Sequence, residues 1–477
     1  MSSTVQGSAG SRINALLDEN SFVEIGAKVT ARATDFNMKN SETPADGVIT
    51  GYGVIDGNLV YVYSQNASVL GGSVGEMHAK KIVRLYELAM KVGAPVIGLV
   101  DCAGLRLQEA TDALNGFGEI YLKQTLASGV IPQITAIFGN CGGGLAVMPA
   151  ITDFTFMEEK NAKLFVNTPN ALAGNNVSKC DTASAKFQSE TCGNVDFVAE
   201  EAVLLAQIRE LVTMLPANNE DDMSYEVCTD DLNRACSDLA NCSGDTSILL
   251  SKIADDNSFL ETKEMYAKEM VTGFVKLNGV TVGCVANRSE VYKEEGLEAS
   301  YPSVLTPAGC EKAAEFIHFC DAFSIPVLSI TNVTGFSAEV EAEKSMAKAA
   351  AKLTYAFANA TVPKVNVIVG NAFGSAYTVM NSKAIGADIV YAWDNAKIGM
   401  MDSKLAAKIM YEGEGNDVIQ AKAAEYDALQ NSVESAAGRG YVDTIIDAAD
   451  TRKYVIGAFE MLFTKREDRP GKKHGTV

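Results

Sequence analysis

Hydrophobic residues along the chain follow first the period of strands and then the period of helices. Two short alternating segments within residues 47–65 flank the turn Asp56-Gly57 and predict a β-hairpin. A helix is predicted over residues 78–92, where the apolar positions fall on one face. Two fully apolar segments, 96–100 and 134–138, follow with a second helix between them. Buried apolar strands that alternate with helices are typical of a layered α/β fold with a largely parallel sheet.

The same order of elements occurs a second time. Short motifs, mostly at proline and glycine, recur in sequence order about 231 residues further along the chain. The best matched positions are Pro95 with Pro326, Gly104 with Gly335, Pro132 with Pro363, Gly139 with Gly370 and Asn140 with Asn371. An ordered series of this kind predicts two copies of one fold, related by internal duplication. We expect one domain over residues 1–225 and another over 246–477, joined by a polar linker at about 216–245.

The composition limits the kinds of partner that this protein can bind. The 477 residues carry 40 basic and 60 acidic side chains, a formal charge of −20. Nucleic acid is therefore not expected as a partner, because phosphate binding needs a concentrated basic surface. An anionic small molecule stays compatible, since it needs only a local pocket of N–H donors.

Targeting segments and metal-ligand clusters are missing from the pattern. No apolar stretch has the length of a membrane span, and the first residues lack an apolar signal core. The ten cysteines include no Cys-x-x-Cys pair, and the histidines are His78, His318 and His474. We expect a cytoplasmic protein with reduced thiols and no metal site.

The candidate chemistry lies in two glycine-rich turns, each at the end of a predicted strand. Residues 139–144 read Gly-Asn-Cys-Gly-Gly-Gly, and residues 370–376 read Gly-Asn-Ala-Phe-Gly-Ser-Ala. A strand-to-helix turn of this kind leaves backbone N–H groups free to hold an anion or a developing oxyanion. The loop 101–104, after the preceding strand, can supply further donors. Neither the G-x-G-x-x-G fingerprint nor a phosphate-cradling P-loop is present, so we predict two oxyanion pockets in one chain.

Four side chains suggest other chemistry, but the residues around them do not favour it in any of the four cases. Cys102 and Cys141 have no neighbouring histidine to activate a thiolate. Ser375 lacks the Gly-x-Ser-x-Gly context of a nucleophile. Lys91 lies in a biotin-attachment-like tetrapeptide, but it closes an amphipathic helix instead of lying on a hairpin turn.

Many segments resemble a known family over nearly the whole chain. They include Ser21–Glu24, Gly71–Ser73, Gly93–Leu99, Gly139–Gly144, Ala360–Lys364, Gly374–Tyr377, Tyr391–Trp393 and Arg439-Gly440. The chain resembles the biotin-dependent acyl-CoA carboxyltransferases, which are built from two crotonase-like domains of the ClpP/crotonase superfamily. The family includes propionyl-CoA carboxylase β subunits, methylmalonyl-CoA decarboxylase α subunits and the transcarboxylase large subunit.

The resemblance implies a role for each glycine turn. The N-terminal half would bind the acyl-CoA and stabilise its enolate, and the C-terminal half would bind biotin through its ureido oxygen. The backbone oxyanion donors would be Gly143, Gly144, Ser375 and Ala376. The remaining ligand contacts would come from Ala103, Gly104, Gly142, Gly71, Gly72, Ser73, Gly335, Phe336 and Gly374. Such catalysis relies on preorganised donors and proximity.

The implied activity is carboxyl transfer between a short-chain acyl-CoA and biotin on a separate carrier protein. We expect a decarboxylase α subunit, with a carboxylase β subunit as the alternative direction. The partners would be a biotin carboxyl carrier protein, a biotin carboxylase or a membrane decarboxylase subunit, and further copies of the chain in a dimer or a trimer of dimers. Partner subunits would bring the protein to a membrane surface in the decarboxylase case. A non-catalytic acyl-CoA-binding assembly subunit and a crotonase-type hydratase or peptidase are the other hypotheses.

Overall fold

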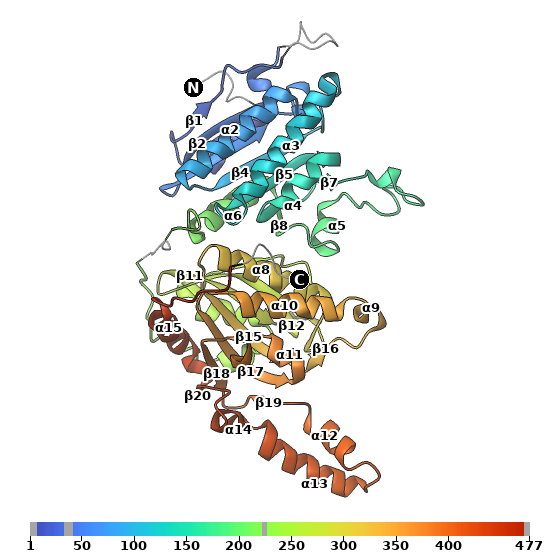
Figure 1. Ribbon diagram of the computed structural model, residues 1–477, viewed down its shortest axis with the longest axis vertical. Helices are drawn as coiled ribbons and strands as arrows, with labels where there is room; N and C mark the ends of the chain where they lie inside the picture. The colour runs from blue at the N-terminus through green and yellow to red at the C-terminus, as the bar shows by residue number, and fades with distance from the viewer. Residues whose placement is uncertain (1–6, 33–41, 222–226, 472–477) are drawn as a thin grey trace. The chain divides into compact units, whose positions relative to one another are not determined.

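The computed structural model describes residues 7–32, 42–221 and 227–471. The chain divides into two compact units, Met1–Asp222 and Met223–Val477 (Figure 1). His474 lies outside the described residues. Each unit is built around one mixed sheet, and the two sheets have the same strand order and the same branch. The duplication inferred from scattered motifs is therefore present throughout the fold.

The sheet of the first unit begins with an antiparallel hairpin and continues with parallel strands. In order across the sheet the strands are β1 (Val23–Ile25), β2 (Val48–Ile55), β3 (Asn58–Gln65), β4 (Val96–Cys102), β5 (Gln133–Gly142), β6 (Phe154–Glu158) and β8 (Phe197–Ala199), with β7 (Lys163–Phe165) paired to the end of β5. The hairpin turn is at Asp56 and Gly57, both in the left-handed region, as the Asp-Gly pair predicts.

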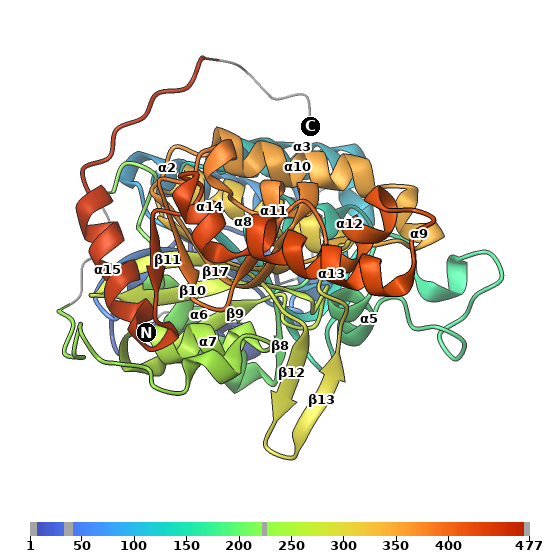
Figure 2. The ribbon, with the colours of Figure 1, turned by 90° about the horizontal axis from the view of Figure 1, so that it is seen from below.

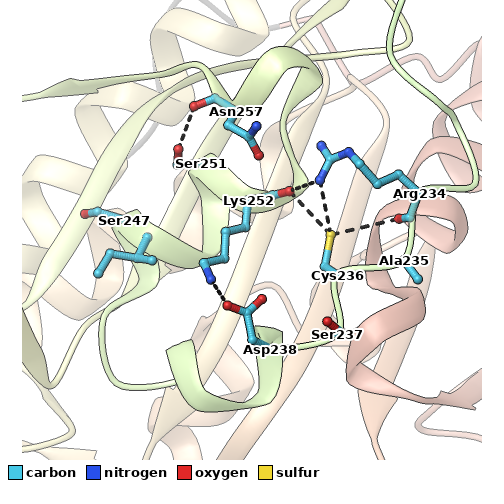
Figure 3. A pocket seen from close by; sticks show the side chains of 10 residues that line it. Arg234, Ala235, Cys236, Ser237, Asp238, Ser247, Ser251, Lys252 and Asn257 are labelled. Carbon is cyan, nitrogen blue, oxygen red and sulfur yellow. Dashed lines mark hydrogen bonds and ion pairs between the residues drawn. The ribbon is translucent and has the colours of Figure 1, made fainter.

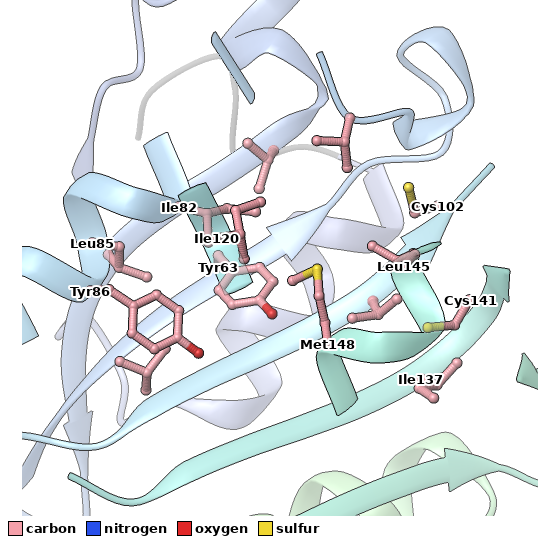
Figure 4. Packing of buried hydrophobic residues seen from close by; sticks show 14 of the residues in the cluster. Tyr63, Ile82, Leu85, Tyr86, Cys102, Ile120, Ile137, Cys141, Leu145 and Met148 are labelled. Carbon is pink, nitrogen blue, oxygen red and sulfur yellow. The ribbon is translucent and has the colours of Figure 1, made fainter. Parts of the chain in front are cut away.

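Helices cover this sheet. They are α1 (Gly7–Leu16), α2 (Glu76–Val92), α3 (Ala110–Ala127), α4 (Val147–Ile151), α5 (Ala185–Glu190) and α6 (Glu201–Met214). Helix α2 ends at Val92 and is capped by Gly93, whose φ of 72° lies in the left-handed region that favours glycine. Ile82 of α2, Ile120 of α3 and Ile137 of β5 are all buried in one hydrophobic core (Figure 4). This core anchors the carboxyl end of β5, where the first glycine turn begins.

The second unit repeats this sheet. Its strands in order are β9 (Phe259–Thr262), β10 (Met270–Leu277), β11 (Val280–Asn287), β15 (Val327–Val333), β17 (Lys364–Phe373), β18 (Ile389–Trp393) and β20 (Thr444–Ile446), with β19 (Lys397–Gly399) paired to the end of β17. Two small sheets are added, β12 (Glu290–Lys293) with β13 (Gly296–Ser300), and β14 (Val304–Leu305) with β16 (Gly335–Phe336). The β12–β13 hairpin projects from its unit (Figure 2).

The helices of the second unit also repeat those of the first, with an additional pair between β19 and β20. They are α7 (Thr246–Ile253), α8 (Pro307–Ala322), α9 (Val340–Glu343), α10 (Met346–Asn359), α11 (Gly374–Val379), α12 (Ser403–Met410), α13 (Asn416–Tyr426), α14 (Val433–Gly438) and α15 (Thr451–Leu462). Helix α8 begins with Thr306 as its N-cap and Pro307 at its first position. Among the described residues, none of the helices is both long and apolar enough to cross a membrane.

The linker is shorter than the polar composition predicts. Arg234 donates hydrogen bonds to the carbonyl oxygens of Lys252 and Ala254, each at 2.9 Å. The fully buried Arg452 donates to the carbonyl oxygen of Asp231 at 3.2 Å and pairs with Asp255 at 2.7 Å. Residues 231–242 therefore belong to the second unit. A polar segment can look like a free linker in sequence when its arginine and aspartate side chains are in fact bonded to a neighbouring element.

Candidate active site: two matched glycine turns

The first glycine turn begins where β5 ends at Gly142. Gly143 has a φ of +64°, a conformation that L side chains rarely adopt, and it starts a short 3-10 turn, Gly143–Ala146. Gly144 is exposed, whereas Leu145 is buried. The first N–H groups of a helical turn have no acceptor within that turn. The exposed peptide at Gly144 can therefore offer its N–H group to a bound oxyanion.

The second turn has the same geometry. Gly374 also has a φ of +64°, and it begins α11 at the end of β17. Ser375 is exposed and Ala376 is buried, as Gly144 and Leu145 are in the first unit. Ser375 is thus the structural equivalent of Gly144, and Ala376 that of Leu145. The donor pairs implied by the resemblance are consequently displaced by one residue between the two turns.

A neighbouring loop approaches each turn in the same way. The β4–β5 ladder is interrupted between Val100 and Cys102, and Cys102 then pairs with Cys141. The β15–β17 ladder is interrupted between Thr331 and Val333. Strand β5 continues to Gly142, four residues beyond its predicted end at Phe138, and its last residues pair with β7. Sequence period alone does not show such an irregularity.

The predicted loop residues of the first unit come together at this edge. A Cβ added at Gly104 would lie 4.0 Å from the Gly142 carbonyl oxygen, and Gly104 has a φ of +100°. Ala103 is exposed, and its N–H donates to the Gly71 carbonyl oxygen at 2.9 Å. Gly71, Ala103, Gly104 and the Gly142–Gly144 turn therefore lie around one site. In the second unit, Gly335 and Phe336 form β16 and pair with β14.

Gly72 and Ser73 have a different position from the one their predicted role suggests. Both are buried. A side chain at Gly72 would collide with the Asp101 carbonyl oxygen, and the Ser73 hydroxyl donates to the Leu70 carbonyl oxygen at 2.7 Å. These two residues pack the two loops together, so their predicted ligand contact stays a prediction.

Arg106 connects these loops through its buried side chain. The sequence pattern does not indicate a role for it. Its guanidinium is almost fully buried and donates to Asp46 at 2.6 Å, to Glu109 at 2.7 Å and to the Ser73 carbonyl oxygen at 2.8 Å. The Glu109 carboxylate also accepts the N–H of Glu76, at the start of α2, at 2.6 Å. One buried cation thus fixes both loops of the first pocket. One acidic partner of Arg106 is 60 residues away in the sequence and the other is three residues away. The spacing of hydrophobic and polar residues along the chain gives no sign of such a buried ion cluster.

His78 is a neutral structural residue in this network. Its ring is buried; Nδ1 lies 2.9 Å from the Asp46 carbonyl oxygen, and Nε2 lies 3.2 Å from Gln65 Nε2. The carbonyl can only accept, so Nδ1 carries the proton and Nε2 accepts from Gln65. Burial, aided by the nearby Arg106, lowers the pKa of His78 to about 3. The ring is therefore neutral at physiological pH and has no free nitrogen for catalysis.

The cysteines at the first pocket are not activated as nucleophiles. Cys102 and Cys141 are both buried. Burial raises the pKa of Cys102 to about 11 and raises the pKa of Cys141 well above its usual value. Reactive cysteines instead have lowered pKa values. The described residues also contain no cluster of three or more His, Cys, Asp or Glu side chains placed to hold a metal ion.

A cleft of about 650 Å³ lies in the second unit, lined by residues other than those of the glycine turns (Figure 3). Lys252 pairs with Asp238 and Arg234 pairs with Asp230 at 2.9 Å. Ser251 donates to the Asn257 carbonyl oxygen at 2.6 Å. Because its charged groups already have partners, this cleft offers no clear ligand chemistry, and the glycine turns remain the candidate site.

The fold of the chain is shared with solved structures. A crystal structure of transcarboxylase 12S matches 99% of this chain and 93% of its own, with a TM-score of 0.92 and 37% sequence identity. Its description names a hexamer assembly and bound hydrolysed methylmalonyl-coenzyme A. The fold is therefore a duplicated crotonase-like α/β fold.

Comparison of sequences shows the family of the chain. The carboxyl transferase domain matches residues 7–477, and the chain belongs to this family of enzymes. It is 38% identical to methylmalonyl-CoA decarboxylase subunit alpha of Propionigenium modestum, over 98% of this chain and 92% of that protein. It is 40% identical to the propionyl-CoA carboxylase beta chain of Roseobacter denitrificans, over 98% and 93%. The chain is thus a carboxyltransferase, as the sequence resemblance implies.

Proposed function

We propose that the chain transfers a carboxyl group between a short-chain acyl-CoA, of the malonyl- or methylmalonyl-CoA type, and biotin held on a separate carrier protein. The observation that carries this proposal is the pair of matched turns, with Gly143 and Gly374 at the same φ of +64°. Each turn exposes its next residue, Gly144 or Ser375, to solvent. Two oxyanion sites in one chain suit a reaction in which two carbonyl-type oxygens become more negative.

The first turn would act on the acyl-CoA. Loss of the carboxyl group leaves its bonding electron pair on the acyl-CoA as an enolate, and gain of the carboxyl group starts from the same enolate, formed by loss of the α-proton. The negative charge of this enolate lies mainly on the thioester oxygen. The N–H groups of Gly143 and Gly144 would donate to that oxygen, and the Ala103-Gly104 loop forms the adjoining wall. Gly71 lies beside Ala103, since a Cβ at Gly71 would lie 3.1 Å from the Ala103 Cβ. Donors of this kind typically contribute about 10²–10³ in rate.

The second turn would hold biotin. When bound, biotin supplies the ureido nitrogen that accepts or releases the carboxyl group. Backbone N–H groups at Gly374, Ser375 and Ala376 would donate to its ureido oxygen, and Gly335 and Phe336 would form the neighbouring wall. The exposed Ser375 has no left-handed backbone angle, so the serine is accommodated without strain. The donor chemistry of this turn fits a neutral urea oxygen that gains negative charge.

The direction and the partners are the finer part of the proposal. We infer decarboxylation, with the chain as an α subunit beside a biotin carboxyl carrier protein and a membrane decarboxylase subunit. Named relatives include both decarboxylase and carboxylase subunits, at 38% and 40% identity. Carboxylation, with a biotin carboxylase as partner, is the alternative direction. Further copies of the chain would complete an oligomer, in which the acyl-CoA half of one copy faces the biotin half of another.

A second candidate function is an acyl-CoA-binding assembly subunit without transfer activity. Ser375 favours it, because a serine replaces glycine at the exposed donor position. The backbone at Ser375 argues against this function, because it is unstrained and the turn has the same conformation as in the first unit.

Carboxyl transfer by the purified protein tests the proposal. The protein is mixed with free biotin and with malonyl-, methylmalonyl- or glutaconyl-CoA, and loss of the acyl carboxyl group is followed by chromatography. We expect biotin-dependent turnover with at least malonyl- or methylmalonyl-CoA. Binding of these thioesters without any turnover would overturn the proposal and favour the assembly subunit. The reverse assay, with an unsubstituted acyl-CoA and carboxylated carrier, then compares the two directions.

A further inference from the structure

Two aromatic residues of α3 cover the first glycine turn. The Tyr121 hydroxyl donates a hydrogen bond to the Gly144 carbonyl oxygen. The Tyr121 and Phe117 rings stack, with centroids 5.9 Å apart and an interplanar angle of 18°. A Cβ added at Gly144 would lie 3.0 Å from the Tyr121 hydroxyl and 3.2 Å from the Phe117 ring. Phe117 is buried in the core, so it holds the tyrosine ring against the turn.

This turn needs an anchor because of its sequence. Gly142, Gly143 and Gly144 are consecutive, and glycine loses more conformational freedom on ordering than any other residue. The Gly144 carbonyl oxygen also accepts the N–H of Val147, and the Phe165 ring lies 2.5 Å from a Cβ added at Gly142. Contacts from both sides thus restrict a stretch of backbone that has no side chains of its own.

In the described part of the second unit, the helix positions equivalent to Phe117 and Tyr121 carry no aromatic ring. The buried positions Met346, Ala349 and Leu353 of α10 match Ala113, Gly116 and Ile120 of α3. This match aligns Phe117 and Tyr121 with Ala350 and Thr354. The Thr354 hydroxyl donates to the Ala350 carbonyl oxygen within α10 itself, at 2.8 Å. The second turn reads Phe373-Gly374-Ser375, with a single glycine, so among the described residues the tyrosine anchor accompanies the turn with three glycines.

We propose that Tyr121 is a positioning residue for the first pocket. By holding the Gly144–Leu145 peptide, to which the Gly144 carbonyl belongs, it fixes the backbone of the turn and so the direction of the neighbouring Gly143 and Gly144 N–H groups. The proposal rests on the proposed function, since it assigns the first turn to the thioester oxygen. Burial raises the pKa of Tyr121, so the phenol stays protonated and remains a donor at neutral pH. Tyr121 acts on the Gly144 carbonyl, and the N–H groups of the turn are left free for the substrate.

The test compares Tyr121→Phe with Tyr52→Phe, which removes a phenol hydroxyl from β2 of the same unit. For Tyr121→Phe we expect kcat of biotin-dependent transfer to fall about five- to tenfold, the effect of one hydrogen bond, with KM for the acyl-CoA changed less than twofold. Tyr52→Phe should change neither value. A kcat for Tyr121→Phe equal to that of Tyr52→Phe would overturn the proposal, as would a change confined to KM.

A second measurement does not depend on activity. Amide hydrogen exchange at residues 143–145 should become faster in Tyr121→Phe and stay unchanged in Tyr52→Phe, because the turn loses one of its anchors. Unchanged exchange at the turn would overturn the positioning role. If the unsubstituted protein shows no transfer, the proposed function fails, and the exchange result still decides whether Tyr121 anchors the turn.

Discussion

Replacing Gly143 by alanine perturbs the first turn through its backbone. The φ of +64° at Gly143 disfavours any residue with a Cβ, by about 1–2 kcal/mol. A Cβ at this position meets no atom within 4 Å, so steric collision adds nothing to that strain. The alanine variant can relieve the strain by changing the torsion angles of the turn, which moves the N–H donors. We expect kcat for carboxyl transfer to fall about 10²–10³-fold, as for other oxyanion donors.

Gly57→Ala is the matched control for this experiment. Gly57 has a φ of +84°, and a Cβ there also meets nothing within 4 Å, but it lies in the β2–β3 hairpin turn. Each substitution should lower the thermal midpoint by about 2–8 °C, from about 1–2 kcal/mol in a unit of this size. Only Gly143→Ala should lose activity. If the two variants have equal kcat and both bind acyl-CoA normally, the first turn is not an oxyanion site.

Three further predictions concern the stability of the first unit and the activity of the second turn. Arg106→Met leaves the buried carboxylates of Asp46 and Glu109 without their cation, and it should destabilise the first unit by about 3–5 kcal/mol, measured by chemical unfolding. The pKa of His78 is about 3 in the folded protein and about 6.5 in the unfolded chain, so the folded state loses stability as the pH falls below about 6.5. The free energy of unfolding should therefore fall by about 2 kcal/mol between pH 8 and pH 5. His78→Gln should reduce this loss. Equal pH dependence in the two proteins would argue against this assignment. Ser375→Gly should change kcat for carboxyl transfer by less than about twofold, because glycine occupies the equivalent position in the first turn. If the unsubstituted protein is inactive and Ser375→Gly is active, the second pocket is the defective one.

Much of the fold was predictable because its signals are local and repeated. The Asp56-Gly57 turn, the period of α2 and the apolar strands each predict their own elements, and the matched prolines and glycines relate the two copies. The two glycine turns were predictable to the same extent, since each follows a matched strand, and both reach a φ of +64°. Their role as oxyanion sites stays a prediction. Roles for individual glycines came only from the family resemblance.

Contacts between distant residues could not be predicted in the same way. Arg106 and Asp46 are 60 residues apart, and nothing in the sequence around either one indicates a buried ion pair. Tyr121 falls at a helical position typical of a core aromatic residue, so its hydrogen bond to Gly144 is visible only when α3 lies on the turn. The linker was overestimated because Arg234 and Asp231 look solvated in sequence.

The most direct test of the two-pocket account is an experimental structure of the protein with a non-hydrolysable acyl-CoA thioester analogue bound. We expect the thioester oxygen to lie about 2.7–3.1 Å from the N–H nitrogens of the Gly143–Gly144 turn. The Gly374–Ser375 turn should stay free for the ureido oxygen of biotin. An acyl group bound at the second turn, or away from both turns, would contradict the account.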